Sequence, residues 1–434
     1  MALWKAGRGG HHQRASGRSW RLLLEAVTAL GLLFAALSVF GVAATRVEVR
    51  SDERLYLDRT RYFAYLFLQH DVSRSEWGDN ESTHSHPMLA DFIVGAGLWA
   101  RGYRLPPDGI LPPARSVPNA LMTEARMPMA TFAVGAVGVL YLLGRALGGP
   151  VAGLTAAALM VAGPLERVDL VQARAESPLA FFLLLALLLG VLGARRGGGG
   201  GLPSGWALAL GLALGLGLGT KLTAALGLLA VLGWGALIAV VAARQGGTSG
   251  AGRLVCAWRA GRGWGLALLV ALGTFVGTDP HLYPGPIEHT MHLIKERRAE
   301  MLRQQPLYPG HAVRNPLNRP GRVLRASLIE ETWGGSRGFP LEAALAGGGA
   351  LALVLAVRRG WRETGYPPSE GLVLLTVFVY FVGISVGLEM AWPRYFLPTH
   401  ILGTILCGRG ASAVISRRPL IRTPLERSAA LART

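Results

Sequence analysis

Apolar segments about as long as a bilayer is thick recur along almost the whole chain, and this repetition limits the folds open to it. A transmembrane helix needs roughly 20 mostly apolar residues. Of the 434 residues, 51% are hydrophobic and only 16% are charged, whereas a soluble domain usually carries about 25% charged residues. The sequence therefore excludes a soluble globular protein and a disordered chain, and it predicts an all-α, polytopic integral membrane protein.

Hydropathy predicts about ten transmembrane helices, with eleven or twelve left open because several apolar segments are short. The expected spans are residues 22–44, 128–147, 151–165, 178–193, 206–219, 222–243, 264–278, 341–357, 372–388 and 396–415. The first follows a polar, basic stretch over residues 1–21 and is longer than the core of a cleaved signal peptide. We interpret it as a retained helix, so residues 22–434 form one transmembrane domain without a visible internal repeat.

The distribution of basic residues orients these helices. Cytoplasmic loops of membrane proteins are enriched in Lys and Arg. With the N-terminus in the cytoplasm, the arginine pairs 195–196, 358–359 and 417–418 and the basic loop 244–262 all fall inside. The segments 45–125 and 279–339 are then outer loops, and the tail from about 416 to 434 is cytoplasmic. This bias explains the formal net charge of +18 without a nucleic-acid partner.

The outer loops carry helices too short or too polar to cross the membrane. Residues 55–68 are amphipathic, and the apolar piece 88–100 contains Asp91 and is too short to span. Both are expected to lie in the membrane interface. A third surface helix is expected over residues 287–302, where several basic side chains could contact anionic lipid head groups.

Two adjacent carboxylates stand directly after the first span. Asp52 and Glu53 lie at the outer membrane–water boundary, where a partly desolvated carboxylate gains basicity and can act as a general base. The alternative is an ordinary solvated loop start with surface acids. The two cysteines, Cys256 and Cys407, show neither metal-ligand spacing nor a disulfide framework.

Further short motifs follow these acids in order, most of them at outer helix ends. They are His86-Pro87-Met88-Leu89, Arg126, Glu176 at the start of Glu-Ser-Pro-Leu-Ala-Phe-Phe, Gly219-Thr220-Lys221, Asp279-Pro280 and Pro393-Arg394-Tyr395. Together they resemble the GT-C class of glycosyltransferases, and most of all glycosyltransferase family 39, the protein O-mannosyltransferases and their bacterial relatives. The family signature has His-Pro-Pro-Leu after the Asp-Glu pair, and here Met88 stands in place of the second proline.

The resemblance implies that a sugar, a mannose-like hexose or a related one, moves from a polyprenyl-phosphate donor to a protein, lipid or glycan acceptor with inversion. Polyprenyl phosphate is a good leaving group, so one carboxylate that takes the acceptor proton suffices, whereas a glycosidase normally needs an acid as well. Asp52 is the expected base, and Glu53 either orients it or bonds nearby backbone. The resemblance also suggests a bacterial inner (plasma) membrane protein with its active site on the outer face and both termini in the cytoplasm.

The departing phosphate gains negative charge and needs fixed cations. The expected phosphate-binding residues are Lys221, Arg394 and Arg54, and the alternative for the first two is a role as snorkelling interfacial anchors. Sugar or acceptor contacts are expected from Glu176, His86, Asp169 and Tyr395. For Glu176, the alternative is a favourable charge at a helix N-terminus.

No cofactor is required by these residues beyond the lipid-linked sugar, although a divalent cation is left open. His289 and His292 lie three residues apart, which places both on one face of the expected surface helix. With an outer carboxylate they could hold a metal ion, and a purely structural role is the alternative. The glycine-rich Gly-Leu-Gly-Thr-Lys stretch lies in an apolar span and lacks the Gly-Lys-Ser/Thr order of a P-loop, so its glycines are expected to serve helix packing.

Two other function classes remain. A transporter or lipid flippase would usually show repeated halves and polar residues at the membrane midplane, whereas the ionisable residues here gather at one surface. A catalytically inactive scaffold with the GT-C fold would keep every fold-determining feature and differ only in turnover.

Overall fold

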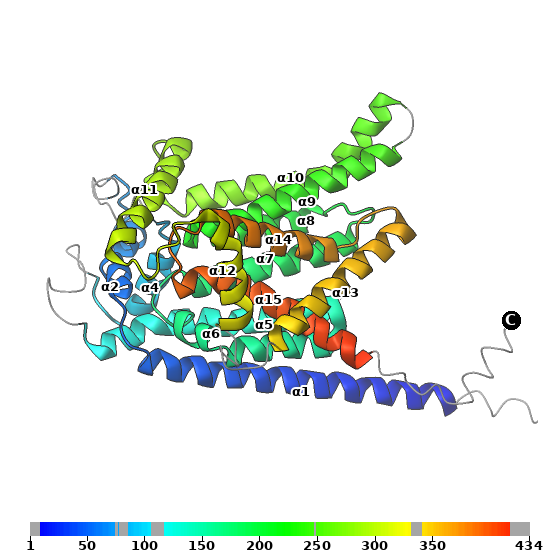
Figure 1. The fold of residues 1–434 in the computed structure, drawn as a ribbon, viewed down its shortest axis with the longest axis horizontal. Helices are drawn as coiled ribbons and strands as arrows, with labels where there is room; N and C mark the ends of the chain where they lie inside the picture. Colours follow the sequence, from blue (N-terminus) through cyan, green and yellow to red (C-terminus); the bar gives the residue numbers. More distant parts are fainter. Residues whose placement is uncertain are drawn as a thin grey trace, which may run out of the picture.

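The structure is a computed structural model that describes residues 9–73, 77, 86–105, 117–246, 249–330 and 341–416. Residues 417–434 of the predicted cytoplasmic tail and residues 1–8 of the basic N-terminal stretch lie outside this range. Long helices run side by side in one bundle (Figure 1). They are α1 (Gly9–Arg46), α5 (Asn119–Ala162), α7 (Glu176–Arg196), α8 (Ser204–Thr220), α9 (Ala225–Gln245), α10 (Gly250–Gly277), α13 (Leu341–Thr364), α14 (Glu370–Gly387) and α15 (Pro393–Ser416). Within the described ranges the only β pairing is an isolated bridge between Ala312 and Met390.

The helical membrane fold predicted from the sequence is confirmed. Among the described residues, seven helices are long and apolar enough to cross a membrane: Leu23–Arg46, Asn119–Ala162, Glu176–Arg196, Leu222–Gln245, Gly250–Gly277, Leu341–Thr364 and Glu370–Gly387. All ten expected segments are helical over most of their length. Two of them fall in α5, which is broken at Gly149. Gly149 has φ +82 and precedes Pro150, a conformation that glycine adopts at little cost.

Helix α10 corrects one sequence prediction. It begins at Gly250 rather than near residue 264, so much of the expected basic loop 244–262 is part of a helical hairpin with α9. The Ser249 hydroxyl caps the helix by accepting a hydrogen bond from the Gly252 N–H at 3.1 Å. Arginine is a good helix former, so the charges that end an apolar span do not end the helix. The hairpin extends away from the bundle in Figure 1.

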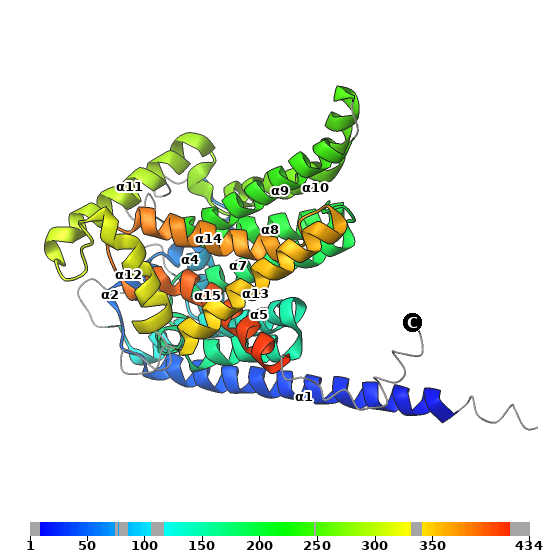
Figure 2. The same cartoon turned by 45° about the vertical axis from the view of Figure 1, so that its right-hand side comes forward.

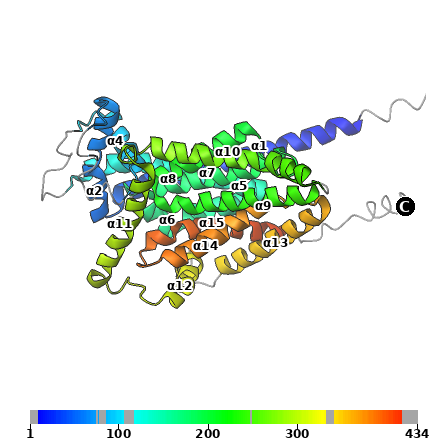
Figure 3. The same cartoon turned by 90° about the horizontal axis from the view of Figure 1, so that it is seen from above.

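The shorter helices gather at the end of the bundle opposite this hairpin tip (Figures 2 and 3). They are α2 (Ser51–Asp58), α3 (Arg61–Phe63) with the π-helical turn Ala64–Leu68, α4 (Leu89–Ala100), η4 (Pro280–Leu282), α11 (Pro286–Leu307), η5 (Pro316–Asn318) and α12 (Arg319–Arg325) with the π-helical turn Ala326–Glu330. Helix α6 (Pro164–Asp169) and η3 (Leu222–Ala224) connect long helices. The structure is therefore helical over most of the expected segments 55–68, 88–100 and 287–302, and the first of these is divided between α2 and α3.

Glycines in α8 let this helix approach α10 closely, as the sequence predicted for them. A Cβ at Gly211 would lie 2.5 Å from the Ala267 carbonyl oxygen, and one at Gly215 would lie 2.5 Å from the Ala271 carbonyl oxygen. Both distances are too short for any side chain, so only glycine permits the contact. Helix α8 ends at Thr220, and its packing therefore fixes the position of Lys221.

Candidate functional site

The Glu53 carboxylate forms hydrogen bonds with three separate parts of the chain. This carboxylate is fully buried and accepts two hydrogen bonds from the Arg126 guanidinium, at 2.7 and 2.6 Å. The backbone N–H groups of Ala173 and Arg50 also donate to it, at 2.8 and 3.0 Å. Because these donors come from α5, the α6–α7 connection and the start of α2, Glu53 fixes the position of the neighbouring Asp52. This arrangement matches the backbone-bonding role that the sequence allowed for Glu53.

Asp52 lies between two guanidinium groups and keeps access to solvent. Its side chain is 39% exposed and forms an ion pair with Arg394 at the start of α15. Arg174 Nη1 is 3.7 Å from the same carboxylate oxygen.

A second ion pair lies where α7 begins and α8 ends. Lys221 Nζ is 2.9 Å from Glu176 Oε1, and Arg174 Nε is 3.7 Å from Glu176 Oε2. Arg174 also pairs with Asp169 at the end of α6. Since Arg174 contacts Asp52 as well, one arginine links the three acids that the sequence placed at separate helix ends.

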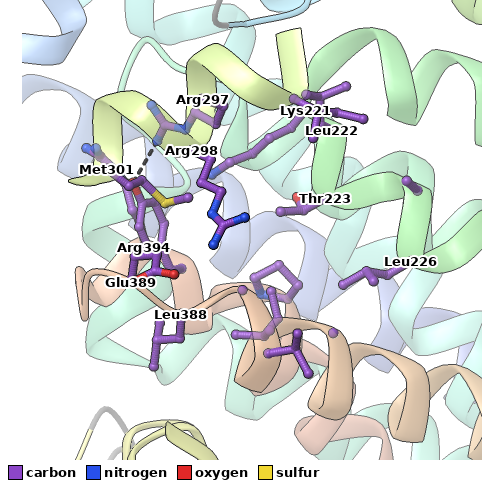
Figure 4. A pocket seen from close by; sticks show the side chains of 18 of the residues that line it. Lys221, Leu222, Thr223, Leu226, Arg297, Arg298, Met301, Leu388, Glu389 and Arg394 are labelled. Atoms are coloured by element: carbon purple, nitrogen blue, oxygen red, sulfur yellow. Dashed lines mark hydrogen bonds between the residues drawn. The ribbon is translucent and has the colours of Figure 1, made fainter. Parts of the chain in front are cut away.

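A mainly apolar cavity of about 580 Å³ opens beside these ion pairs, and we call it the apolar cavity. Its apolar wall comes largely from α9, α11, α14 and α15. Its polar lining consists of His86, Lys221, Thr223, Arg297, Arg298, Arg319, Glu389, Arg394 and Tyr395. Figure 4 shows Arg298 projecting from α11 into the space bounded by Lys221, Leu388 and Arg394. An apolar cavity edged by cations fits a ligand with a hydrocarbon chain and an anionic head.

A more polar cavity of about 500 Å³, the polar cavity, adjoins the apolar cavity at Arg394. It is lined by Arg50, Ser51, Asp52, Pro164, Leu165, Val168, Asp169, Gln172, Arg174, Gln304, Tyr308, Trp392, Pro393 and Arg394. Asp52 faces this second cavity, while Arg394 lines both.

Burial sets the protonation of two predicted site residues. It holds the pKa of His86 well below the ordinary value, with help from the nearby charges of Arg297, Arg59 and Lys221. His86 is accordingly neutral at physiological pH. Burial raises the pKa of Asp169, although the charge of Arg174 opposes this shift.

Six of the eleven predicted site residues line the two cavities, whereas Glu53, Glu176 and three others do not. His86, Lys221, Arg394 and Tyr395 line the apolar cavity, and Asp52 and Asp169 line the polar one. Among the described residues that line these cavities, Arg54, His289 and His292 are not found. His289 instead places Nδ1 at the His281 carbonyl oxygen, 2.5 Å away, and packs its ring against that of His281.

The described residues also include no group of three or more His, Cys, Asp or Glu side chains arranged to hold a metal ion. The donor set around the two cavities consists of carboxylates already paired with arginine or lysine.

Sequence reasoning missed several residues that line the cavities, among them Gln172, Trp392 and Arg297. Gln172 carries no charge and lies in a short connection, and Trp392 immediately precedes the Pro-Arg-Tyr motif. Arg297, which the sequence assigned to lipid head groups, donates a 2.6 Å hydrogen bond to the Tyr395 hydroxyl and lines the apolar cavity. The only signal for Gln172 was the run of polar residues at 169, 172, 174 and 176 in an otherwise apolar region.

Comparison with solved structures identifies the fold class. The chain is similar to ArnT from Cupriavidus metallidurans bound to undecaprenyl phosphate, with a TM-score of 0.50, 18% identity and coverage of 90% of this chain and 60% of ArnT. It is also similar to the archaeal oligosaccharyltransferase AglB from Archaeoglobus fulgidus in complex with an inhibitory peptide and a dolichol-phosphate. That match has a TM-score of 0.56, 13% identity and coverage of 94% and 52%. The fold is that of the GT-C glycosyltransferases.

Comparison with family models gives a match to part of the chain. The model for dolichyl-phosphate-mannose-protein mannosyltransferases matches residues 116–250, which include Arg126, Glu176 and Lys221 but neither Asp52 nor Arg394. The likeness to this family that the motifs predicted is thus confirmed. No curated protein matches the sequence. The chain spans about 60% of ArnT and about half of AglB.

Proposed function

We propose that this protein transfers a mannose-like hexose, or a related sugar, from a polyprenyl-phosphate donor to a hydroxyl acceptor on the non-cytoplasmic side of the membrane. The observation that carries the proposal is the pair of adjoining cavities that share Arg394. The apolar cavity offers an apolar wall for the polyprenyl chain and Lys221 and Arg394 for its phosphate. The polar cavity offers Asp52 to the acceptor.

In this mechanism the acceptor hydroxyl attacks the anomeric carbon from the polar cavity. Asp52 takes the hydroxyl proton, and the bond from the anomeric carbon to the phosphate oxygen breaks with inversion. The phosphate keeps the bonding electron pair, and Lys221 and Arg394 stabilise the negative charge that it gains. Glu176 holds Lys221 in place through their ion pair.

Both GT-C structures that the chain resembles contain a polyprenyl phosphate, undecaprenyl phosphate in ArnT and dolichol-phosphate in AglB. This supports a donor of the same chemical class here. The site at the outer end of the bundle, the location in a bacterial inner membrane and the cytoplasmic termini belong to the same proposal. They are supported by the arginine-rich segments 195–196 and 358–359, which stand at helix ends away from the cavities.

The test is transfer by the purified protein in lipid nanodiscs, with radiolabelled polyprenyl-phosphate mannose and a panel of peptide, glycolipid and oligosaccharide acceptors. Asp52→Asn is expected to lower the transfer rate about 10²–10⁴-fold, as loss of a general base does. Asp58→Asn makes the same change at the other end of α2 and should leave the rate within about twofold of wild type. Equal rates for wild type and Asp52→Asn would remove Asp52 as the base.

A further inference from the structure

One side chain of the polar cavity has no role in the transfer chemistry. Gln172 lies in the connection between α6 and α7, is 1% exposed and lines the cavity wall. Within the described residues, neither its Nε2 nor its Oε1 atom has a hydrogen-bond partner. Buried polar groups are almost always hydrogen-bonded. A side-chain amide without hydrogen-bond partners at a cavity wall therefore indicates a ligand that supplies both a donor and an acceptor.

The groups around Gln172 define the chemistry of that ligand. A glutamine amide offers two N–H donors and one carbonyl acceptor. Asp169 adds carboxylate acceptors and Arg174 adds guanidinium donors along the same wall. Adjacent hydroxyl groups on a sugar ring each donate and accept, so a polyhydroxylated ligand satisfies such a mixed set.

Aromatic rings form another part of the cavity. Trp392 and Tyr308 both line it, and their rings meet edge to face with centroids 5.2 Å apart. The Trp392 ring is fixed in place, since its indole N–H lies 3.3 Å from Gln304 Oε1 and it stacks on His311 with centroids 4.1 Å apart. Rigid aromatic rings give contact area at a low entropic cost, and they suit the C–H faces of a pyranose ring.

We propose that the polar cavity is a carbohydrate subsite that holds the acceptor, so that the nucleophile is a hydroxyl group of a glycan or glycolipid. This inference rests on the proposed function and specifies its acceptor. Inversion requires the nucleophile and the leaving phosphate to lie on opposite faces of the sugar, and the two cavities that adjoin at Arg394 offer a separate place for each. The acceptor oxygen forms the new bond to the anomeric carbon while its proton passes to Asp52.

A peptide acceptor fits this cavity less well. Extended peptides are commonly held by backbone hydrogen bonds to an exposed strand edge. The part of the chain that the structure describes contains only the isolated bridge between Ala312 and Met390.

The first experiment measures binding directly. Saturation-transfer NMR is recorded on the protein in nanodiscs with mannotriose, cellotriose or a Ser/Thr-containing hexapeptide as the probe. Wild type is compared with Gln172→Leu and with Gln245→Leu, a matched change at the end of α9, where the amide donates to the Gly365 carbonyl at 2.9 Å. At least one trisaccharide should bind wild type and Gln245→Leu alike. Gln172→Leu should weaken its affinity about tenfold or more, as loss of two hydrogen bonds does.

Tyr308→Ala provides a second variant at a residue that is 48% exposed, where truncation is tolerated more easily than in the core. It should weaken trisaccharide binding several-fold. Trisaccharide binding that is absent, or that is unchanged in both variants, overturns the proposal. Peptide binding that depends on Gln172 while no trisaccharide binds also overturns it, in favour of a polypeptide acceptor.

The second experiment separates the acceptor sugar from the donor sugar. With labelled polyprenyl-phosphate mannose, release of free mannose to water reports on the donor alone, and transfer to the trisaccharide reports on both. Gln172→Leu should leave donor hydrolysis within about twofold of wild type and raise KM for the trisaccharide at least tenfold. An equal fall in donor hydrolysis would place the donor sugar in this cavity and overturn the acceptor assignment. If wild type neither hydrolyses nor transfers, the proposed function fails, while the binding experiment still decides whether the cavity is a carbohydrate subsite.

Discussion

At the scale of single residues, the neighbouring acids Asp52 and Glu53 have opposite environments. Successive side chains on an α-helix point about 100° apart, so α2 directs one carboxylate into the protein and the other toward the polar cavity. Glu53 is fully buried against Arg126, whereas Asp52 is 39% exposed beside Arg394. The sequence placed both acids at the site. Which of the two acids is buried depends on Arg126, because it pairs with Glu53, and this arginine lies 73 residues further along the chain.

Replacing Glu53 should destabilise the protein more than replacing an exposed acid. Glu53→Gln leaves the Arg126 guanidinium buried without its counter-charge, which costs about 3–5 kcal/mol. Glu363→Gln removes the partner of Arg359 in an exposed pair, where the cost is small because water screens the two charges. Unfolding of both variants is compared with wild type by denaturant titration in detergent. An equal loss of unfolding free energy in the two variants would contradict the structural importance of the Glu53–Arg126 ion pair.

A buried acid cluster predicts a pH dependence of stability. Asp91 pairs with Arg59 at 2.9 Å, and burial still raises the pKa of Asp91 and that of Asp279 to about 7. Between about pH 4 and 7 the folded state therefore holds protons that the unfolded state has released. The free energy of unfolding should fall as pH rises through this window, by up to about 1.4 kcal/mol per pH unit for each group, and level off above pH 7.

Asp279→Asn should make this slope shallower, because an amide has no proton to release. Asp71→Asn changes an exposed acid that bonds Ser73 and should leave the slope as in wild type. The measurement is the unfolding midpoint of each protein between pH 4 and 8. A slope in Asp279→Asn as steep as that of wild type would contradict the raised pKa of this residue.

At the scale of helices, the apolar pattern located nearly every long element but not the contacts between them. Hydropathy predicted the span later seen as α7 to within a few residues, because an uninterrupted apolar run has few alternatives in a membrane. It placed the start of α10 about 14 residues too late, since arginines ended the apolar run although the helix continues to Gly250. The α6–α7 connection, with Gln172 and the N–H that binds Glu53, lacks periodicity and was not predictable.

The glycine spacing of α8 makes a prediction at this scale. Gly215→Ala places a methyl group 2.5 Å from the Ala271 carbonyl oxygen and from Thr274 Cβ, so α8 and α10 must separate. Separation should lower the unfolding temperature and also reduce turnover, because Lys221 at the end of α8 moves. Gly273→Ala adds a methyl group to α10 with nothing within 4 Å. It should leave both quantities unchanged, and a similar loss there would show that the close packing is not the cause.

At the scale of the whole molecule, the bundle concentrates its chemistry at one end. The start of α7, the end of α8 and the start of α15 bring Glu176, Lys221 and Arg394 together, although Glu176 and Arg394 lie more than 200 residues apart in the chain. The opposite end carries the α9–α10 hairpin and the Arg195–Glu370 ion pair. Successive long helices run in opposite directions, so every second loop lies at the same end of the bundle. For this reason the order of short motifs along the sequence was informative although each one alone was weak.

Lys221 and Arg394, the two cations proposed to bind the phosphate, predict how the whole protein responds to a lipid phosphate. A ligand that binds only the folded state stabilises it by about 2.7 kcal/mol at 100 times its Kd, so undecaprenyl phosphate should raise the unfolding temperature in detergent. Undecaprenol has the same chain without the phosphate and should have a much smaller effect. Lys221→Gln removes one charged contact, worth about 1.5–3 kcal/mol, and should weaken undecaprenyl phosphate binding about 10- to 100-fold. Lys295→Gln, on α11 and outside the apolar cavity lining, should bind as wild type does. Equal stabilisation by the alcohol, or equal affinity in Lys221→Gln, would show that this lysine does not hold the phosphate.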